Sequence, residues 1–382
     1  MDKKPTISLV YEFLSEQGGL EREIINHANF LKQEGYNVLI LTCHKGKDIE
    51  MLLPFDGLKI VEISSIKTRF QFLNLALCFL GFNNLKKHNP SLFLSYSAPS
   101  NFLIKNKKTK KLNYVNHYPH FLYLEKNKKL EWANTFDRKI SLFLSLFFKR
   151  KLINLDRRLL RENKLIFTNS NFTKKTIDFM YKVDSIVSYP PIDSKIKSLK
   201  NKVVPKPFIF TCGRIIPDKK YGWLIKSCAL MKNKIPVYIA GQGNKKYIQT
   251  LINLSKKLNV KLFFLGKLNT PELTKYYSSA EVFVFSAPKE DFGLVPAESL
   301  ACGTPCVVWG DNAGPTEQII EGINGFHAKP YDLHDFAKKI DKLININFKK
   351  NNREKIINSA SKFSAKEIKE LFINEINKVL KD

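Results

Sequence analysis

The sequence is short of the residues that build a metal centre or a disulfide framework. Its 382 residues include 6 cysteines and 7 histidines, and no two cysteines form a Cys-x-x-Cys pair. All six cysteines lie in apolar stretches, which predicts buried thiols in a reducing compartment. No Asp-x-Asp pair occurs, and no cluster of acidic, histidine and cysteine residues has zinc or calcium spacing. We therefore expect no bound metal and no cofactor.

Long hydrophobic runs are missing as well. The first five residues lead directly into a strand-like segment, Ile7–Phe13, without the apolar stretch of a signal peptide. The two longest apolar runs, Phe70–Phe82 and Ile140–Phe148, are shorter or more interrupted than the roughly 20 residues that a membrane-spanning helix needs. We expect a cytoplasmic protein, and we consider the inner face of the membrane as its place of action.

Negative charge is scarce: 35 Asp and Glu face 63 Lys and Arg, a net charge of +28. Such an excess favours nucleic acid, an anionic membrane or phosphorylated small molecules. An equally weighted explanation is a lysine-rich composition spread over solvated faces, because no long basic block exists. Without a nucleic-acid-binding module or a basic stripe interleaved with stacking aromatics, we do not expect a nucleic-acid partner.

Short apolar runs alternate with helical periodicity along most of the chain, which predicts an α/β protein with parallel sheets. A proline-punctuated stretch from Tyr189 to Pro207 separates two such series. We expect a first domain at residues 1–190, a second at 191–360, and a C-terminal helix at 361–382 that packs back on the first. Ligands of such sheets bind at the carboxyl ends of the strands, so a cleft between the two edges is the expected active site.

The stretch Lys289–Glu298 carries the most informative pattern. Glu290 follows a predicted strand, and Glu298 comes eight positions later, within what we expect to be the first turn of the next helix. A carboxylate accepts two hydrogen bonds side by side, which suits the neighbouring hydroxyls of a sugar. The backbone N–H groups of the intervening Phe292, Gly293 and Leu294 lie near the helix start and suit a phosphate.

A second pattern, Cys212–Lys220, also follows a strand and precedes a helix. It places Arg214 and Lys219 on the connecting loop, at the expected cleft. Two fixed cations there would neutralise the pyrophosphate of a departing nucleoside diphosphate. A third pattern, Gly18-Gly19, fills the first strand-to-helix turn, where glycines let the backbone approach a phosphate.

The run from Glu290 to Pro305 resembles the donor-site signature of retaining glycosyltransferase family 4, whose fold is GT-B with two Rossmann-like domains facing a cleft. The resemblance extends to Gly213–Lys219, to the Gly18-Gly19 turn and to Gly310–Ile319. It implies that Glu298 binds the donor ribose, that Glu290 lies at the donor sugar, and that Arg214 and Lys219 hold the diphosphate. Lys220 stands where the family usually has glycine.

The resemblance also assigns a role to a histidine. His117 follows the predicted strand Leu112–Asn116 and occupies the place of a family histidine that contacts the donor sugar. An imidazole there would bond a sugar hydroxyl and respond to charge at the anomeric carbon. His120 is a nearby competitor, and we favour His117.

The function implied is the transfer of a hexose, with retention and without metal, from a nucleoside diphosphate sugar to a glycan or lipid-linked acceptor. GDP-mannose is the first expectation for the donor, and UDP-glucose or UDP-N-acetylglucosamine the second. A sugar-nucleotide epimerase or α-glucan phosphorylase of related fold, and a basic nucleic-acid-binding protein, are the alternatives. The apolar run Ile140–Phe148, flanked by lysines and arginines, is either a helix on an anionic membrane or a core helix.

Overall fold

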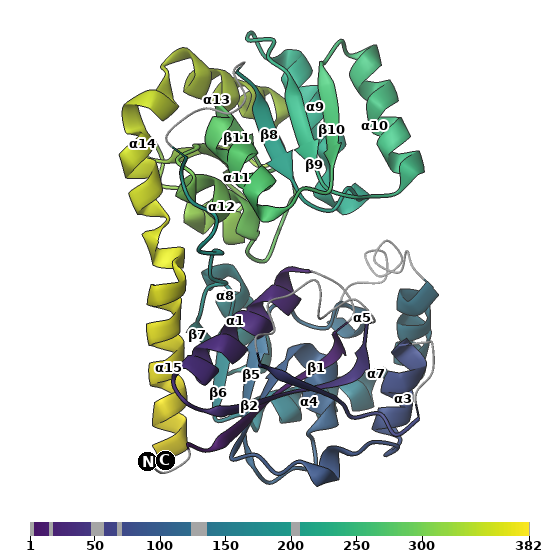
Figure 1. Ribbon diagram of the computed structural model, residues 1–382. Helices are drawn as coiled ribbons and strands as arrows, with labels where there is room; N and C mark the ends of the chain where they lie inside the picture. Colours follow the sequence, from purple (N-terminus) through teal and green to yellow (C-terminus); the bar gives the residue numbers. More distant parts are fainter. Residues whose placement is uncertain are drawn as a thin grey trace. The chain divides into compact units, whose positions relative to one another are not determined.

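The computed structural model describes residues 4–14, 18–46, 57–66, 71–123, 136–199 and 207–381. The chain forms two compact units, one of Met1–Tyr189 with Lys369–Asp382 and the other of Pro190–Ile368 (Figure 1). The division falls at Tyr189-Pro190, inside the proline-punctuated stretch. Residues before a proline favour extended backbone, which suits a connection between domains.

The first unit is built on a seven-stranded parallel sheet with the strand order β3-β2-β1-β4-β5-β6-β7. Parallel strands that are covered on both faces read as continuous apolar runs, and all five residues of β4 are buried accordingly. The strands are β1 (Thr6–Leu14), β2 (Asn37–Lys45), β3 (Lys59–Glu62), β4 (Leu92–Tyr96), β5 (Lys110–Val115), β6 (Leu165–Thr168) and β7 (Ile186–Val187).

Helices connect these strands. The first, α1, buries Ile24, Ile25, Ala28 and Leu31 on one face, and Gly35 follows it with φ 84°, as the sequence pattern predicts. The helices are α1 (Gly19–Gln33), α3 (Gln71–Phe79), α4 (Ser97–Leu103), α5 (His120–Tyr123), α7 (Phe136–Arg161) and α8 (Asn171–Tyr181), with a 3-10 turn, η1 (Leu85–Lys87). The run Ile140–Phe148 is helical, but its side chains lie outside the described part, so neither interpretation of it is decided.

The C-terminal helix α15 (Ala365–Lys381) carries the chain back to the first unit, which includes it from Lys369 onward. Phe372 stacks on the ring of His27 with centroids 4.1 Å apart, and its ring also lies 5.3 Å from that of Phe167. Lys369 pairs with Glu34 at 2.9 Å. This part of α15 therefore closes the core of the first unit.

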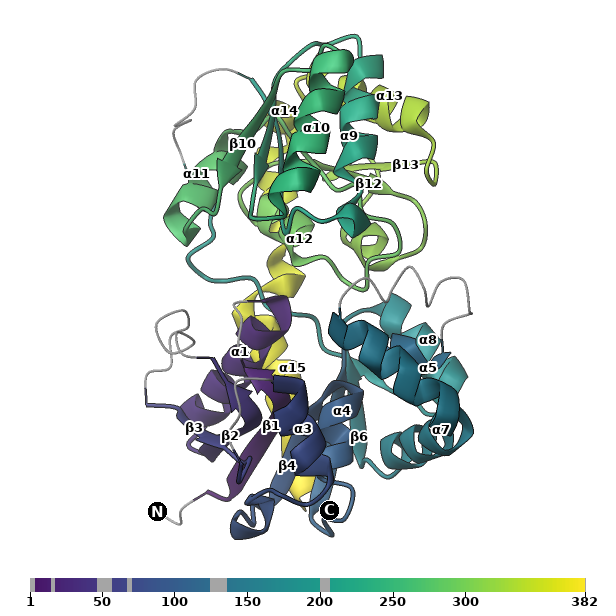
Figure 2. The same cartoon turned by 90° about the vertical axis from the view of Figure 1, so that its right-hand side faces the viewer.

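The second unit holds a six-stranded parallel sheet with the strand order β10-β9-β8-β11-β12-β13. Figure 2 labels three of these strands, β10, β12 and β13. The strands are β8 (Ile209–Cys212), β9 (Val237–Ala240), β10 (Leu262–Gly266), β11 (Val282–Val284), β12 (Cys306–Trp309) and β13 (Gly325–Ala328). The helical segments are η2 (Pro217–Lys219), α9 (Tyr221–Leu230), α10 (Lys245–Lys257), α11 (Thr270–Ser279), α12 (Leu294–Ala301), η3 (Gly314–Gln318), α13 (Leu333–Asn345), α14 (Phe348–Ser359) and η4 (Ser361–Phe363).

The topology fixes where a ligand would bind in each unit. The direction of connection reverses between β1 and β4 in the first sheet and between β8 and β11 in the second. Doubly wound sheets bind ligands at the carboxyl ends of the strands beside such a reversal. The predicted class, two doubly wound parallel α/β domains, is confirmed.

Candidate functional site: a cationic and acidic edge of the second sheet

Two neighbouring strands of the second sheet carry most of the predicted residues. Strands β8 and β11 pair in parallel, so their carboxyl ends lie side by side. Arg214 and Lys219 follow β8, whereas Glu290 and Glu298 follow β11. The topological reversal of this unit therefore gathers both predicted cations and both predicted carboxylates in the segments that leave one sheet edge.

Lys219 and Glu290, 71 positions apart in sequence, form an ion pair in which Nζ lies 2.7 Å from Oε2. The side chains are 20% and 29% exposed, so the pair is reachable by a ligand yet partly shielded from water. The backbone supports it, because Ser286 Oγ donates to the carbonyl of Lys219 at 2.9 Å. An ammonium has three donors, so Lys219 has the capacity to bind a phosphate oxygen while holding Glu290.

The backbone conformation of the loop after β8 explains why the resembling family usually has glycine at the position of Lys220. Lys220 adopts the left-handed conformation, with φ 52° and ψ 36°, between η2 and α9. Glycine reaches this region without a steric penalty, while other residues pay about 1–2 kcal/mol. The chain keeps the loop geometry with lysine, and Lys220 Nζ lies 5.6 Å above the ring of Trp223. Arg214, earlier on the same loop, is exposed.

Glu298 lies in the second turn of α12, not in the first as expected, because the helix begins at Leu294. Its side chain is buried, at 2% exposure. Tyr277 of α11 donates its hydroxyl to Oε2 at 2.7 Å, and that hydroxyl also lies 2.9 Å from Cys212 Sγ. The buried tyrosine holds one carboxylate oxygen and thereby fixes the orientation of Glu298 at the end of β8.

The turn between the two glutamates is fixed by η3. Gly293 precedes α12 in the left-handed conformation, with φ 71°. Gln318 Nε2 donates to the carbonyls of Phe292 and Gly293 at 2.6 and 3.0 Å, and Gly314 donates its N–H to the carbonyl of Glu290. Phe292 itself is buried. Residues 292–294 therefore lead into the positive N-terminal end of α12, where a phosphate is favoured.

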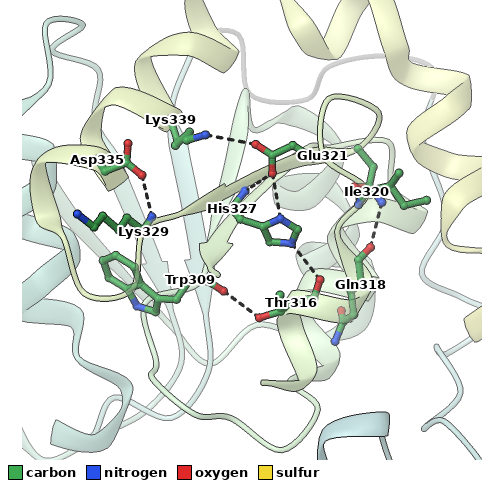
Figure 3. A network of polar contacts seen from close by, with 10 residues as sticks. Trp309, Thr316, Gln318, Ile320, Glu321, His327, Lys329, Asp335 and Lys339 are labelled. Atoms are coloured by element: carbon green, nitrogen blue, oxygen red, sulfur yellow. Dashed lines mark hydrogen bonds and ion pairs between the residues drawn. The ribbon is translucent and has the colours of Figure 1, made fainter. Parts of the chain in front are cut away.

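A network of polar contacts holds η3 in place (Figure 3). Thr316 Oγ1 donates to the carbonyl of Trp309 at 3.0 Å, and His327 Nε2 lies 3.0 Å from the carbonyl of Thr316. The other ring nitrogen of His327 lies 2.9 Å from Glu321, which also pairs with Lys339 at 3.2 Å. The network runs from β13 to η3, and Gly314 of η3 donates to the carbonyl of Glu290, so the network supports the turn between Glu290 and Glu298.

Sequence reasoning missed a third acid in this region. Asp291 follows Glu290 directly, and its burial, then the nearby Glu290 charge, raise the pKa of Asp291 to about 8, against the opposing effect of Lys219. At neutral pH this carboxyl is mostly protonated, so it adds no second negative charge beside Glu290. Its position beside Glu290 is the sequence signal that was available.

Sequence reasoning also missed the glycines after β9. A side chain on Gly241 would collide with the backbone of Gly213, and one on Gly243 with the carbonyl of Ile215. Ile215 donates its N–H to the carbonyl of Gln242 at 2.7 Å, which extends the pairing of β8 and β9 into their loops. The Gly-x-Gly pair directly after a strand was the available signal. The two glycines let the loops after β8 and β9 approach each other closely, and this contact positions the loop that bears Arg214.

In the first unit, Gly18 and Gly19 lie where they were predicted, at the start of α1. Gly18 is the N-cap residue with extended backbone, and Gly19 is exposed with open space around it. The carboxylate of Glu21 lies directly over Gly18, in the space that a larger residue would need. The helix start thus has an acid of its own chain nearby, which a bound phosphate would have to displace or avoid.

His117 follows the carboxyl end of β5 and is exposed. Its ring lies edge-on to that of His120 with centroids 5.3 Å apart, and His120 in turn stacks on Tyr118 at 4.7 Å. His117 belongs to the same sheet edge as Gly18 and Gly19. These three residues lie in the first unit, whereas the cations and the glutamates lie in the second.

Several negative findings hold for the described residues. No three histidine, cysteine, aspartate or glutamate side chains in them converge as a metal site. All six cysteines are described and buried, and none of them is in a disulfide, so the prediction of buried thiols is confirmed. None of the helices in the ranges given above combines the length and the apolar character needed to cross a bilayer.

Residues 193–363 match the family described as glycosyl transferases group 1. Among curated proteins, the chain is 28% identical over 243 residues to human GDP-Man:Man(3)GlcNAc(2)-PP-Dol alpha-1,2-mannosyltransferase, covering 57% of this chain and 49% of the human protein. It is 23% identical over 438 aligned positions to an alpha-1,3/1,6-mannosyltransferase of Debaryomyces hansenii, covering 94% of this chain and 88% of the yeast protein.

Among solved structures, the fold is similar to that of the HepE protein of Anabaena in complex with UDP. The TM-score is 0.75 at 15% identity, over 98% of this chain and 99% of that one. At this identity the likeness concerns the fold alone, and that fold is GT-B, as the resemblance implied. The second unit thus carries both the family match and the arrangement of cations and carboxylates described above.

Proposed function

We propose that this chain, whose second unit is a glycosyl transferases group 1 domain, transfers a hexosyl group from a nucleoside diphosphate sugar to a glycan or lipid-linked acceptor. The proposal includes retention of configuration and independence from metal. The carrying observation is the edge at β8 and β11, where Lys219 pairs with Glu290 at 2.7 Å and Glu298 is held by Tyr277.

Each side chain has a role that its chemistry allows. Arg214 and Lys219 would neutralise the diphosphate as the bond to the anomeric carbon breaks, which replaces the charge that a divalent ion would supply. Glu298 would accept the two ribose hydroxyls, and Glu290 the hydroxyls of the sugar. His117 would contact the sugar near the reacting carbon. The acceptor oxygen would form the new bond on the face that the diphosphate leaves, and we assign no covalent nucleophile.

The human relative is named for transfer from GDP-mannose to a PP-Dol-linked glycan, which supports GDP-mannose as the donor and a lipid-linked glycan as the acceptor. The Debaryomyces relative is also named as a mannosyltransferase, which supports the sugar. A second candidate is a UDP-sugar, because the HepE structure of the same fold contains UDP. Six buried thiols that are not in disulfides support a reducing location, and we place the reaction in the cytoplasm at the inner face of a membrane.

The direct test is sugar transfer by the purified chain. The chain is incubated with labelled GDP-mannose or UDP-glucose and a lipid-linked oligosaccharide in the presence of a metal chelator. The anomeric configuration of the product is then determined by NMR. Lys219→Gln should lower kcat by about 10²–10³, the typical loss when one fixed electrostatic donor is removed. Lys220→Gln, which removes the same charge from the neighbouring position, should leave kcat close to that of the unaltered chain.

Other outcomes of these assays would favour one of the alternative functions. Formation of a free epimerised donor without any acceptor would assign an epimerase. Steeply salt-dependent binding to RNA or DNA, in a chain that turns over no sugar nucleotide, would assign a nucleic-acid-binding protein. An equal loss of activity in both lysine variants would remove the special role of Lys219.

A further inference from the structure

The second half of α7 presents a row of cationic side chains that the proposed reaction does not use. Arg150, Asn154, Arg157, Arg158 and Arg161 are all exposed, and their spacing of three or four residues places them along one side of the helix. The positions between them that are buried, such as Leu159 and Leu160, face the core of the first unit. The row is therefore a solvent-facing surface of a well-packed helix.

An open groove of about 490 Å³ lies on this surface, lined by Asn154, Arg157, Arg158, Arg161 and Glu162. Glu162, the one acid in this lining, lies 3.2 Å from Lys111 and 3.6 Å from Arg158. Because three arginines and one carboxylate line the groove, its lining keeps a net positive charge. Arg161 is also fixed in place, because its Nε donates to the carbonyl of Tyr181 at 2.7 Å.

The end of α8 contacts the groove through the carbonyl of Tyr181 and carries an exposed apolar side chain nearby in sequence. Phe179 lies two residues before Tyr181 and is 75% exposed, with Lys182 Nζ 4.7 Å from the centre of its ring. The nearby acids Asp178 and Asp184 are both paired with Lys174, at 2.8 and 2.7 Å. Asp178 and Asp184 share the single charge of Lys174, and Lys182 supplies a second positive charge, so these four side chains carry no net charge. An exposed ring with a cation above it suits the boundary between lipid headgroups and acyl chains.

We infer that the arginine face, defined as Asn154, Arg157, Arg158 and Arg161 with Phe179 and Lys182, binds the phosphate groups of an anionic bilayer surface. The inference deepens the proposed function, since it names the surface on which a lipid-linked acceptor would be met. Guanidinium groups form paired hydrogen bonds with phosphate oxygens. No aromatic residue stands among the arginines from 150 to 161, and Phe179 is the one aromatic side chain of the arginine face, whereas single-stranded nucleic-acid sites interleave several stacking rings with their cations.

The place of the arginine face separates it from the predicted chemistry. Helix α7 ends at Arg161, just before β6 begins at Leu165, so the arginines lie toward the amino edge of the first sheet. His117 follows the carboxyl end of β5, at the opposite edge of the same sheet. A change at the arginine face therefore alters membrane binding without altering the groups proposed to contact the donor.

The test is co-sedimentation of the full chain with phosphatidylcholine vesicles, with and without phosphatidylglycerol. Binding should require the anionic lipid and weaken with salt. The double variant Arg157→Gln and Arg158→Gln should lower the partition coefficient about thirtyfold, equivalent to about 1 kcal/mol for each lost charge. The matched control, Lys256→Gln with Lys257→Gln, removes two exposed neighbouring charges at the end of α10 and should bind vesicles like the unaltered chain.

Three results would overturn the inference: equal binding to both vesicle types, an equal loss in the control, or an arginine variant that loses affinity for RNA while its vesicle binding is unchanged. A fourth result would also overturn the inference. If inorganic phosphate raised the melting temperature of the unaltered chain but not of the arginine variant, while vesicle binding was the same in both, the groove would bind a soluble anion. Sugar transfer to a water-soluble acceptor is measured in parallel. It should be unchanged in the arginine variant, so a failure of the inference is distinct from a failure of the proposed function.

Discussion

At the scale of single residues, Glu290 and Glu298 come from one short stretch but have different surroundings. Glu290 is partly exposed and paired with a lysine, whereas Glu298 is buried and bonded to a tyrosine hydroxyl. A partly exposed carboxylate is able to exchange partners with a sugar hydroxyl at small cost. A buried one is held in a fixed orientation, which suits recognition of a rigid ribose.

Glu298→Gln should weaken binding of the nucleoside diphosphate. The change replaces a charge-assisted acceptor by a neutral amide, and hydrogen bonds to charged groups contribute about 1.5–3 kcal/mol, or roughly ten- to a hundredfold in Kd. Isothermal titration calorimetry measures the effect. Tyr277→Phe keeps the carboxylate and removes its anchor, so it should weaken binding less. An unchanged Kd in Glu298→Gln, with an unchanged melting temperature, would remove Glu298 from the donor site.

The raised pKa of Asp291 predicts that donor affinity and stability depend on pH, each with a definite sign. Because the folded-state pKa is raised to about 8, the carboxyl is neutral below that pH and gains a charge above it. Donor affinity should therefore fall as pH rises through about 8, since a second anion then faces the diphosphate. The stability contributed by the bound proton should be lost as pH rises from about 4 to about 8, because over this range the unfolded chain has released the proton while the folded chain still holds it.

Asp291→Asn should flatten the fall in donor affinity, because asparagine stays neutral at every pH. Titrations of nucleoside diphosphate at several pH values measure it. Glu367→Gln, at an exposed carboxylate of α15, serves as the control and should keep the profile of the unaltered chain. If donor affinity fell with pH in the same way in the unaltered chain, in Asp291→Asn and in Glu367→Gln, a group other than Asp291 would cause the fall above pH 8.

At the scale of elements, the strands of the second unit and their order of connection follow from the alternation of apolar runs with helical periodicity. Helix boundaries follow less well. The pattern predicts a helix from about Pro296, but α12 begins two residues earlier, after the left-handed Gly293. The turn before it is fixed by Gln318 of η3, a contact that spans 25 residues or more, and local propensity carries no information on such a contact.

The loops after β8 and β9 give a prediction at this scale. Gly243→Ala should destabilise the second unit, because the new methyl group would collide with the carbonyl of Ile215 and separate two loops that hydrogen-bond each other. Overpacking of this kind typically costs about 1–3 kcal/mol. Chemical denaturation measures the change in free energy of unfolding, and nucleotide affinity should fall with it.

Gly222→Ala is the matched control for this variant. Gly222 lies inside α9, where an added methyl group meets only ordinary van der Waals neighbours. Alanine is the better helix former by about 1 kcal/mol, so this variant should be neutral or more stable. If both alanine variants unfolded at the same denaturant concentration, close packing of the two loops would not be what Gly243 provides.

At the scale of the whole molecule, the net charge of +28 has more than one use. Two of the cations, Arg214 and Lys219, lie at the carboxyl edge of the second sheet, and the arginine face gathers others on α7. Many remaining lysines are exposed, which agrees with the compositional explanation for much of the excess. The charge by itself therefore predicted a class of ligand, phosphate-bearing molecules, but no site.

The whole chain also gives the most economical test of the donor. A ligand present at a hundred times its Kd should add about 2.7 kcal/mol to the free energy of unfolding. We expect one family of nucleoside diphosphates, guanine before uracil, to raise the melting temperature in the absence of metal. Adenosine diphosphate serves as the control and should shift it little. A panel that leaves the melting curve unmoved would contradict the donor site.

The sequence determined the fold class, the proline-punctuated stretch between the two units and the segments that bear the predicted site residues, because apolar periodicity and local motifs are properties of neighbouring positions. Only the tertiary structure decided that Lys219 meets Glu290 and that Tyr277 holds Glu298, since these pairs join residues 71 and 21 positions apart. It also decided the raised pKa of Asp291 and the groove on α7. Burial and long-range contact depend on how distant segments pack, and no local pattern encodes them.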